Sequence, residues 1–371
     1  MTDPGPPATP GQSRAPNIRD VAREAGVSYQ TVSRVINGSP SIRPATRQKV
    51  LDAIDELGYR PNQAARALVT SRSRVIGVLL SDARSYGPSF TLQSIEAAAR
   101  AKDYFVSTAT IALPDPPSIR SALDHLMRQN IDGLGVIAPQ TRVFDVIQQL
   151  SPDLPLVTLE ASGRKDGHTI AIDQEQGARL ATRHLIELGH TEIEHLAGPQ
   201  DWIEAQTRMD GFLAEIRDND LGTRPPILGD WTADFGYYAG TQMLGRFDFT
   251  AVFASNDQMA LGLLHAFRDA GVDVPGDVSV VGFDDVPDAR HFWPPLTTIR
   301  QRYELLGARC VDMLLGQIEG DQERYHELIA AELVVRGSTA PPRARAGSSG
   351  SRRCPIRCRC STSPARCSDS R

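Results

Sequence analysis

Cysteine is scarce in the part of this 371-residue chain that can form a compact body. Four of the five cysteines crowd into the C-terminal stretch, namely Cys354, Cys358, Cys360 and Cys367. Only Cys310 lies elsewhere, in a helix-like segment where a small buried thiol is the default. This distribution is typical of a reducing compartment. The spacing of the last four cysteines is irregular and does not predict a zinc site.

Long apolar runs are missing as well. None approaches the roughly 20 residues that span a bilayer, and residues 1–16, rich in Pro, Gly and Thr, lack the apolar core of a secretory signal. We therefore expect a cytoplasmic protein with a disordered leader over residues 1–16. Residues 338–371 lack large apolar side chains, so we predict a disordered tail. An abnormal C-terminus, such as a reading-frame extension, is an equally good explanation of the composition of this segment.

The charge is unevenly distributed. Residues 14–74 carry 11 Arg/Lys against five Asp/Glu, a net charge of +6, whereas residues 75–336 carry 21 against 38, a net charge of −17. A basic first segment followed by an acidic body suggests that a small N-terminal module binds a polyanion. The acidic body then has a different function. On charge alone, chance clustering of surface side chains is the alternative.

Residues 17–61 predict a compact domain of three short helices. Asn17 can cap the first helix, and Gly26 can end it in a tight turn. Ser28 is the natural N-cap of the second helix, and Pro44 suits the first turn of the third. Pro61 disfavours helical geometry in the residue before it, so we place the end of the domain at this proline.

The second of these helices has two different faces on a helical wheel. Val32, Val35 and Ile36 form an apolar face that can pack on the other two helices. The opposite face offers a phenol, an amide and a guanidinium, which are groups that read base edges in the major groove. We predict a helix-turn-helix with residues 29–37 as recognition helix; a three-helix bundle whose polar face merely meets solvent is the alternative. The predicted DNA-contacting residues here are Ser28, Tyr29, Gln30, Thr31, Ser33, Arg34 and Asn37.

Residues 62–74 predict a hinge helix and a linker. Residues 62–68 favour helix but are too few to be stable alone in water, and Leu68 has no obvious core partner. A hinge that folds on DNA and wedges this leucine into the minor groove explains both facts. The predicted DNA contacts of the hinge are Asn62, Ala65 and Leu68; a plain interdomain linker is the alternative.

Residues 75–337 alternate between short apolar strands and amphipathic helices, which indicates parallel sheets covered on both faces. The expected strands are residues 75–80, 105–110, 133–138, 156–159, 169–173, 251–255 and 278–283. They are too many for one sheet of usual size, so we predict two doubly wound α/β lobes with a cleft between them. The N-lobe is expected to span about 75–172 and 301–331, and the C-lobe about 173–300 and 332–337.

Polar side chains follow several of these strands, where ligands of open α/β sheets bind. Asn256 and Asp284 come directly after two strands, and Arg208 and Trp231 follow turns that contain glycine. Carboxylate, amide and guanidinium groups can exchange hydrogen bonds with sugar hydroxyls, and an indole covers the C–H face of a sugar. The pattern predicts a sugar site; structural polar groups at strand ends are the alternative.

Several motifs resemble the LacI/GalR family of bacterial repressors. They are residues 17–22, 26–28 and 31–35 in the helical domain and residues 255–262, 280–285 and 295–299 in the body. The resemblance covers roughly residues 17–337. It implies a periplasmic-binding-protein-like body and an effector cleft for a galactoside-like ligand, lined by Arg208, Trp231, Asn256, Asp284 and Gln301 with Ser81 and Glu160 from the N-lobe. Glu160, Glu204 and Ser85 depart from the family's pattern and bear on which sugar fits.

We therefore predict a repressor of sugar-utilisation genes that a sugar releases from its operator. One recognition helix per chain reads a half-site, which predicts a homodimer on palindromic DNA, and the tail has no leucine heptads to favour a tetramer. A sugar-binding protein without a regulatory role is the alternative.

Neither an enzyme nor a cofactor or metal site is expected. Asp257, Asp284 and Asp285 resemble the paired carboxylates of a glycosidase, but adjacent residues at a strand end usually point in different directions. The glycines at 133 and 135 form no dinucleotide fingerprint, and the histidines at 184, 190 and 195 lack metal-ligand spacing.

Overall fold

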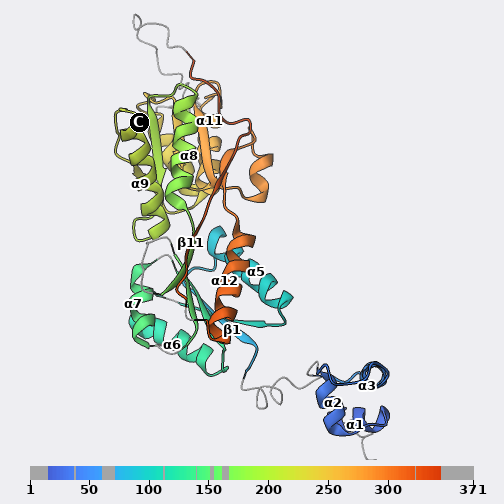
Figure 1. Ribbon diagram of the computed structural model, residues 1–371. Coiled ribbons are helices and arrows are strands. Elements are labelled where there is room, and N and C mark those ends of the chain that lie inside the picture. Colours follow the sequence, from blue (N-terminus) through green and yellow to red (C-terminus); the bar gives the residue numbers. More distant parts are fainter. Residues whose placement is uncertain are drawn as a thin grey trace, which may run out of the picture. The chain divides into compact units, whose positions relative to one another are not determined.

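The computed structural model of the chain describes residues 16–36, 39–60, 72–111, 113–138, 140–150, 154–160, 167–321 and 323–343. It divides into two compact units, Met1–Ser73 and Arg74–Arg371 (Figure 1). Asn37 and the predicted hinge contacts Asn62, Ala65 and Leu68 lie outside the described residues. Among the described residues, every helix is too short or too polar to cross a membrane.

The N-terminal unit contains the three expected helices, α1 (Ile18–Glu24), α2 (Tyr29–Ile36) and α3 (Pro44–Leu57). Asn17 caps α1, since its side-chain oxygen accepts hydrogen bonds from the backbone N–H groups of Arg19 and Asp20 at 2.8 and 3.2 Å. The Asp20 carboxylate accepts the Asn17 N–H in return, which completes a capping box. Gly26, with φ at +65°, then reverses the chain.

The core of this unit is small and apolar. Val21, Val32 and Val50 are fully buried, one from each helix, and Val35 is almost so. On α2 the buried valines lie opposite the exposed side chains of Tyr29, Gln30 and Arg34. The two faces predicted for this helix are therefore confirmed.

The N-lobe of the larger unit is built on a parallel six-stranded sheet. Its order is β11 (His326–Ile329), β5 (His168–Ile172), β4 (Leu156–Leu159), β3 (Gly133–Ile137), β1 (Val75–Leu80), β2 (Phe105–Thr110). Its helices are α5 (Tyr86–Ala101), α6 (Pro116–Met127), α7 (Thr141–Leu150) and α12 (Tyr303–Glu319). Along β1, Ile76 and Val78 face the core that α5 and α12 cover, whereas Leu79 faces the core under α6 and α7.

The C-lobe contains a second six-stranded sheet. Its order is β12 (Glu332–Val334), β10 (Thr297–Arg300), β9 (Ser279–Asp284), β8 (Ala251–Ala254), β6 (Ile193–Ala197), β7 (Ile227–Leu228). All neighbouring strands are parallel except β12, which is antiparallel to β10. Its α-helices are α8 (Gln174–Glu187), α9 (Ile203–Asp218), α10 (Ala233–Met243) and α11 (Asp257–Asp269), and a 3₁₀ helix spans Pro287–His291. The predicted pair of doubly wound lobes is confirmed.

The chain passes between the lobes three times, after β5, after β10 and after β11 (Figure 1). Gln174 lies at the first crossing and Gln301 at the second. The amide of Gln174 donates a hydrogen bond of 2.9 Å to the side-chain oxygen of Gln301. The crossings therefore bring residues distant in sequence to one place between the sheets.

The ordered C-lobe continues past residue 337, where the sequence predicted the start of a disordered tail. Ser338 is fully buried; its hydroxyl donates to the carbonyl of Val280 at 2.6 Å and accepts the N–H of Thr297 at 2.8 Å. Ala340 donates its N–H to Ser279. The prediction was wrong for residues 338–343 because small polar residues pair with strand backbone without forming a core of their own.

Close packing of α10 on α11 depends on two glycines. A Cβ at Gly262 would overlap the backbone oxygen of Ala233, and one at Gly236 would overlap that of Met259. We expect Gly262→Ala to lower the free energy of unfolding by about 1–3 kcal/mol because the helices must separate. Chemical denaturation followed by tryptophan fluorescence measures this.

Gly222→Ala is the matched control for that variant, since a Cβ at Gly222 meets nothing within 4 Å. Its free energy of unfolding is expected to stay within about 0.5 kcal/mol of the parent chain. Equal stability of the two variants would contradict the role given to Gly262.

Candidate functional site

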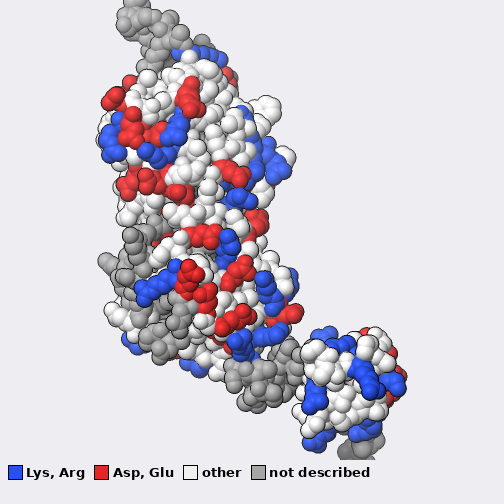
Figure 2. All heavy atoms as spheres, in the orientation of Figure 1, with Lys and Arg blue, Asp and Glu red and all other residues white. Residues whose placement is uncertain are grey.

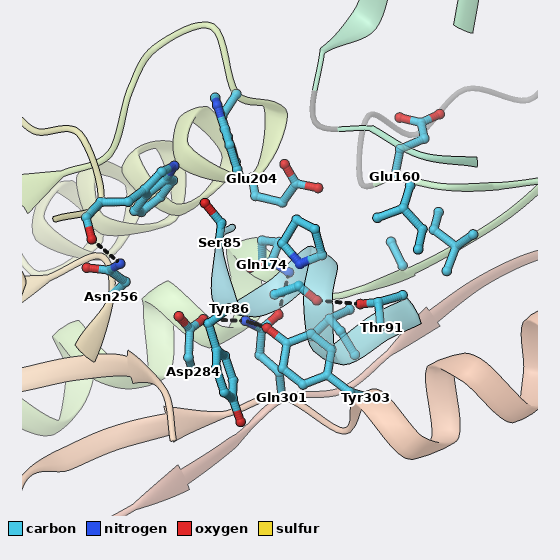
Figure 3. Close-up of a pocket in the computed structure, with 18 of the residues that line it drawn as sticks. Ser85, Tyr86, Thr91, Glu160, Gln174, Glu204, Asn256, Asp284, Gln301 and Tyr303 are labelled. Carbon is cyan, nitrogen blue, oxygen red and sulfur yellow. Dashed lines mark hydrogen bonds between the residues drawn. The ribbon is translucent and has the colours of Figure 1, made fainter. Parts of the chain in front are cut away.

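A cavity of about 360 Å³ lies between the two lobes of the larger unit (Figure 3). Six of the seven predicted effector contacts line it, namely Glu160, Arg208, Trp231, Asn256, Asp284 and Gln301. The seventh, Ser81, is not among the lining residues, and its hydroxyl donates a hydrogen bond of 2.8 Å to Gln140. Their roles in binding stay predictions.

Four side chains in the cavity wall form a closed ring of polar contacts. The Nε of Arg208 donates to Gln174 at 2.8 Å, Gln174 donates to Gln301 at 2.9 Å, and Gln301 donates to Asp284 at 2.6 Å. The guanidinium of Arg208 lies 3.6 Å from the carboxylate of Asp284 and closes the ring. Because each member holds its neighbour, the ring presents fixed donors and acceptors to a ligand.

Asp284 is the buried acid of this ring. It ends β9 with φ at +114°, a backbone conformation that L residues rarely adopt and that is concentrated at functional sites. Burial raises the pKa of this carboxyl to about 6, against the opposing effects of Arg208 and Gln301. The group is therefore mainly ionised at neutral pH and accepts strong hydrogen bonds.

Arg208 is held in place by three further contacts. It donates to the backbone carbonyl of Ser255, and its guanidinium carbon lies 3.8 Å from the ring centroid of Phe283 and 5.5 Å from that of Trp231. Such stacking suits a planar guanidinium.

Asn256 organises the aromatic side of the cavity. Its side-chain oxygen accepts the N–H of Met259 and caps α11, while its amide donates to the backbone carbonyl of Trp231 at 2.9 Å. Trp231 has φ at +72°, and its indole covers Gly198, where a Cβ would overlap the ring. Trp202 meets Trp231 edge-to-face with 5.5 Å between ring centroids. An indole surface in this position can cover the apolar face of a sugar.

The structure adds lining residues that were not predicted as contacts. Chief among them are Tyr86, Gln174, Trp202, Glu204 and Tyr303. Gln174 could have been predicted as a lining residue, because it lies at the junction between a strand and the helix that follows, just after the N-cap of that helix. A position at such a junction is also what predicted Asn256. Glu204 was noted only as a departure from the family pattern; burial raises the pKa of its carboxyl to about 7.

Two of the three carboxylates considered for a glycosidase, those of Asp257 and Asp285, serve structural contacts. Asp257 accepts hydrogen bonds from the hydroxyl of Thr298 at 2.6 Å and the N–H of Val286 at 2.9 Å. Asp285 pairs with Arg300 and Arg336 at 2.6 and 2.5 Å. Within the described residues, His, Cys, Asp and Glu side chains do not gather in groups of three or more that can hold a metal ion.

The second candidate surface is the polar face of α2. The Ser28 hydroxyl accepts the N–H of Thr31 at 3.1 Å and caps the helix. Tyr29, Gln30 and Arg34 are exposed. Lys and Arg side chains are spread over the visible face of this three-helix unit (Figure 2). An exposed helix with such side chains can enter a major groove.

One chain thus carries a helix-turn-helix unit and a two-lobed unit with a polar cavity, which together define the class of ligand-responsive transcription regulators. Residues 17–62 match the family model described as bacterial regulatory proteins, lacI family, and residues 182–339 match the periplasmic binding protein-like domain. The lactose operon repressor of Escherichia coli (strain K12) is 35% identical over 333 residues, covering 89% of this chain and 92% of the repressor. The chain belongs to the lacI family of bacterial regulatory proteins.

Other relatives agree with this assignment. The HTH-type transcriptional repressor PurR of Haemophilus influenzae (strain ATCC 51907 / DSM 11121 / KW20 / Rd) is 32% identical over 330 residues, covering 86% of this chain and 98% of PurR. The crystal structure of the lac repressor dimer bound to operator and the anti-inducer ONPF matches with a TM-score of 0.80 and 34% identity, covering 88% of this chain and all of that chain. These relatives are repressors, and the chain is a regulatory protein of this family and not an enzyme.

Proposed function

We propose that the chain is a transcriptional repressor that binds a palindromic operator as a homodimer and leaves it when a sugar occupies the cavity between the lobes. The observation that carries this proposal is the ring of Arg208, Gln174, Gln301 and Asp284 beside the indole of Trp231. Fixed donors and acceptors next to an apolar aromatic face match the two kinds of surface on a sugar.

DNA recognition falls to α2 and the residues around it. Ser28, Thr31 and Ser33 suit phosphates or bases, while Tyr29, Gln30 and Arg34 are the side chains that select sequence. One such helix reads a half-site, so two copies related by a twofold axis fit a palindrome. The related lac repressor, solved as a dimer on its operator, supports this arrangement. A regulator of this kind works in the cytoplasm, where bacterial DNA lies.

A galactoside-like sugar is the ligand we propose, because the relatives of this chain include the lactose operon repressor of Escherichia coli. Sugar and operator each favour a different arrangement of the two lobes, and the segment around residues 62–68 passes the change to the DNA-binding unit. Linkage then requires that operator DNA weaken sugar binding by the factor by which sugar weakens DNA binding.

A fluorescence-anisotropy titration tests this proposal. The full chain is titrated into a labelled palindromic duplex and into a scrambled one, each with and without a panel of mono- and disaccharides. We expect a preference for one palindrome that a sugar removes. A chain that binds sugar but shows no preference among duplexes would instead be a sugar-binding protein without a regulatory role.

Sugar affinity should fall as the pH drops through the pKa of Asp284. That pKa is raised to about 6, so the carboxylate is ionised at pH 7 and mainly protonated at pH 5. If the sugar hydroxyls donate to the ionised form, the affinity for a neutral sugar falls about tenfold between pH 7 and pH 5. Calorimetric titrations across this range measure it.

Glu204→Gln provides the control for this pH dependence, because the pKa of Glu204 is raised to about 7 and this group titrates in the same range. The fall should persist in that variant. A sugar affinity that stays constant down to pH 5 would show that ionised Asp284 is not the acceptor.

A further inference from the structure

The wall of the cavity contains more acidic than basic side chains. The acidic residues Glu160, Glu204, Asp230 and Asp284 line it, together with the cations Arg84 and Arg208. The 3.6 Å contact between Arg208 and Asp284 pairs these two groups with each other.

One carboxylate oxygen of Glu204 makes no hydrogen bond within the described residues. This atom, Oε2, is buried. Figure 3 shows its carboxylate pointing toward the side of the cavity from which Glu160 comes. Burial raises the pKa of Glu204 to about 7, and the nearby charge of Glu160 raises it further, while its own backbone N–H and Arg208 act in the opposite sense.

Helix stability does not account for a glutamate at this place. Glu204 is the second residue of α9, where an acid favours the helix dipole. Glu175 has the same position in α8, and its side chain is exposed to solvent. An acid at this helical position therefore has no need to turn inward, and the buried Oε2 of Glu204 is without a partner among the described residues.

The surroundings of Glu204 favour an organic cation. Trp202 and Trp231 line the same cavity and meet edge-to-face; aromatic rings beside a carboxylate bind ammonium groups. The indole Nε1 of Trp231 is also buried without a partner among the described residues, so a ligand oxygen can accept its hydrogen bond. Among the described residues, His, Cys, Asp and Glu side chains do not gather here in a group of three or more that could hold a metal ion.

We propose that the effector is an amino sugar, whose protonated amine pairs with Glu204 while one of its oxygens accepts the N–H of Trp231. This inference rests on the proposed function, because it identifies the ligand of the same cavity. Glu204 then decides between hexosamines and hexoses, and the ring of Arg208, Gln174, Gln301 and Asp284 binds the hydroxyls that both share.

Calorimetric titration of the full chain at pH 7.5 tests the proposal. The probes are glucosamine, galactosamine and mannosamine, their parent hexoses, and their N-acetyl derivatives, which keep the nitrogen but lose the charge. We expect at least one amino sugar to bind tenfold or more tightly than its parent hexose and its N-acetyl form. Glu204→Gln should reduce this ratio to near one, whereas Glu175→Gln should leave it unchanged.

Circular dichroism of Glu204→Gln establishes that the variant is folded before its ratio is interpreted. Parent hexoses that bind as tightly as the amino sugars, a Glu204→Gln variant that keeps the preference, or no binding of any amino sugar would each overturn the proposal. If neutral sugars bind and release operator DNA, the proposed function stands without this inference. If no sugar of either kind changes DNA affinity, both fail.

Discussion

Replacing Asp284 by asparagine is expected to weaken sugar binding by about 100-fold or more and to leave operator DNA bound at sugar concentrations that release the parent chain. A hydrogen bond to a charged group contributes about 1.5–3 kcal/mol to binding, and the carboxylate of Asp284 is expected to accept two of them from sugar hydroxyls. Removal of the charge weakens both bonds. The side-chain oxygen of asparagine can still accept from Gln301, which donates to Asp284 at 2.6 Å. The variant therefore changes charge more than shape.

The test is a pair of titrations, sugar into free protein and sugar into the protein–operator complex. Asp288→Asn is the matched control, since Asp288 lies four residues away, is exposed and does not line the cavity. Operator affinity without sugar should be the same for all three chains. An Asp284→Asn chain that still releases DNA at the parent's sugar concentration would show that the effector binds elsewhere.

Arg34→Ala is expected to cost about 1–3 kcal/mol on the cognate operator, or about 5- to 150-fold in affinity, with a much smaller loss on random DNA. Arg34 is exposed on α2, and the neighbouring Val32 and Val35 hold the helix to the core. Removal of its side chain is therefore expected to delete a base contact and to leave the core intact. Anisotropy titrations on both duplexes at fixed salt measure the two losses.

Lys49→Ala separates base reading from simple charge. Lys49 is an exposed cation on α3, in the same unit but outside α2. If it contacts DNA at all, it meets phosphate, so its loss should weaken cognate and random duplexes equally. Equal losses on the two duplexes for Arg34→Ala as well would refute sequence reading by α2.

Helices and the long apolar strands were predictable because their signals are local. The burial of Val32 and Val35 opposite Tyr29 follows from helical periodicity, and β1 spans the predicted residues 75–80. The strand β6 was missed because it contains Glu194 and His195, both buried. Arg224 and Arg246 compensate the charge of Glu194 at 3.2 and 3.0 Å, from places in the chain that no local pattern connects to it.

The remaining missed strands are short. β7 has two residues, β12 has three, and β10 and β11 have four each. β12 is also the antiparallel edge of a sheet that is otherwise parallel. The shortest of these segments acquire strand geometry from the neighbour they pair with. β10 and β11 are as long as the predicted β4 and β8, but they contain ionisable side chains that weaken the strand signal.

By itself, the sequence determined that this chain has a three-helix module whose second helix has one apolar and one polar face, followed by two α/β lobes, because periodicity and turn residues act over a few positions. It also located Asn256 and Asp284 at strand ends. Only the tertiary structure decided that Gln174, Arg208, Asp284 and Gln301 close into one ring and that Ser81 lies outside the cavity. It also decided that the Oε2 of Glu204 is buried without a partner among the residues that the structure describes. The physical reason is that the crossings between lobes set these contacts, and burial of a charge depends on the whole surroundings of a side chain.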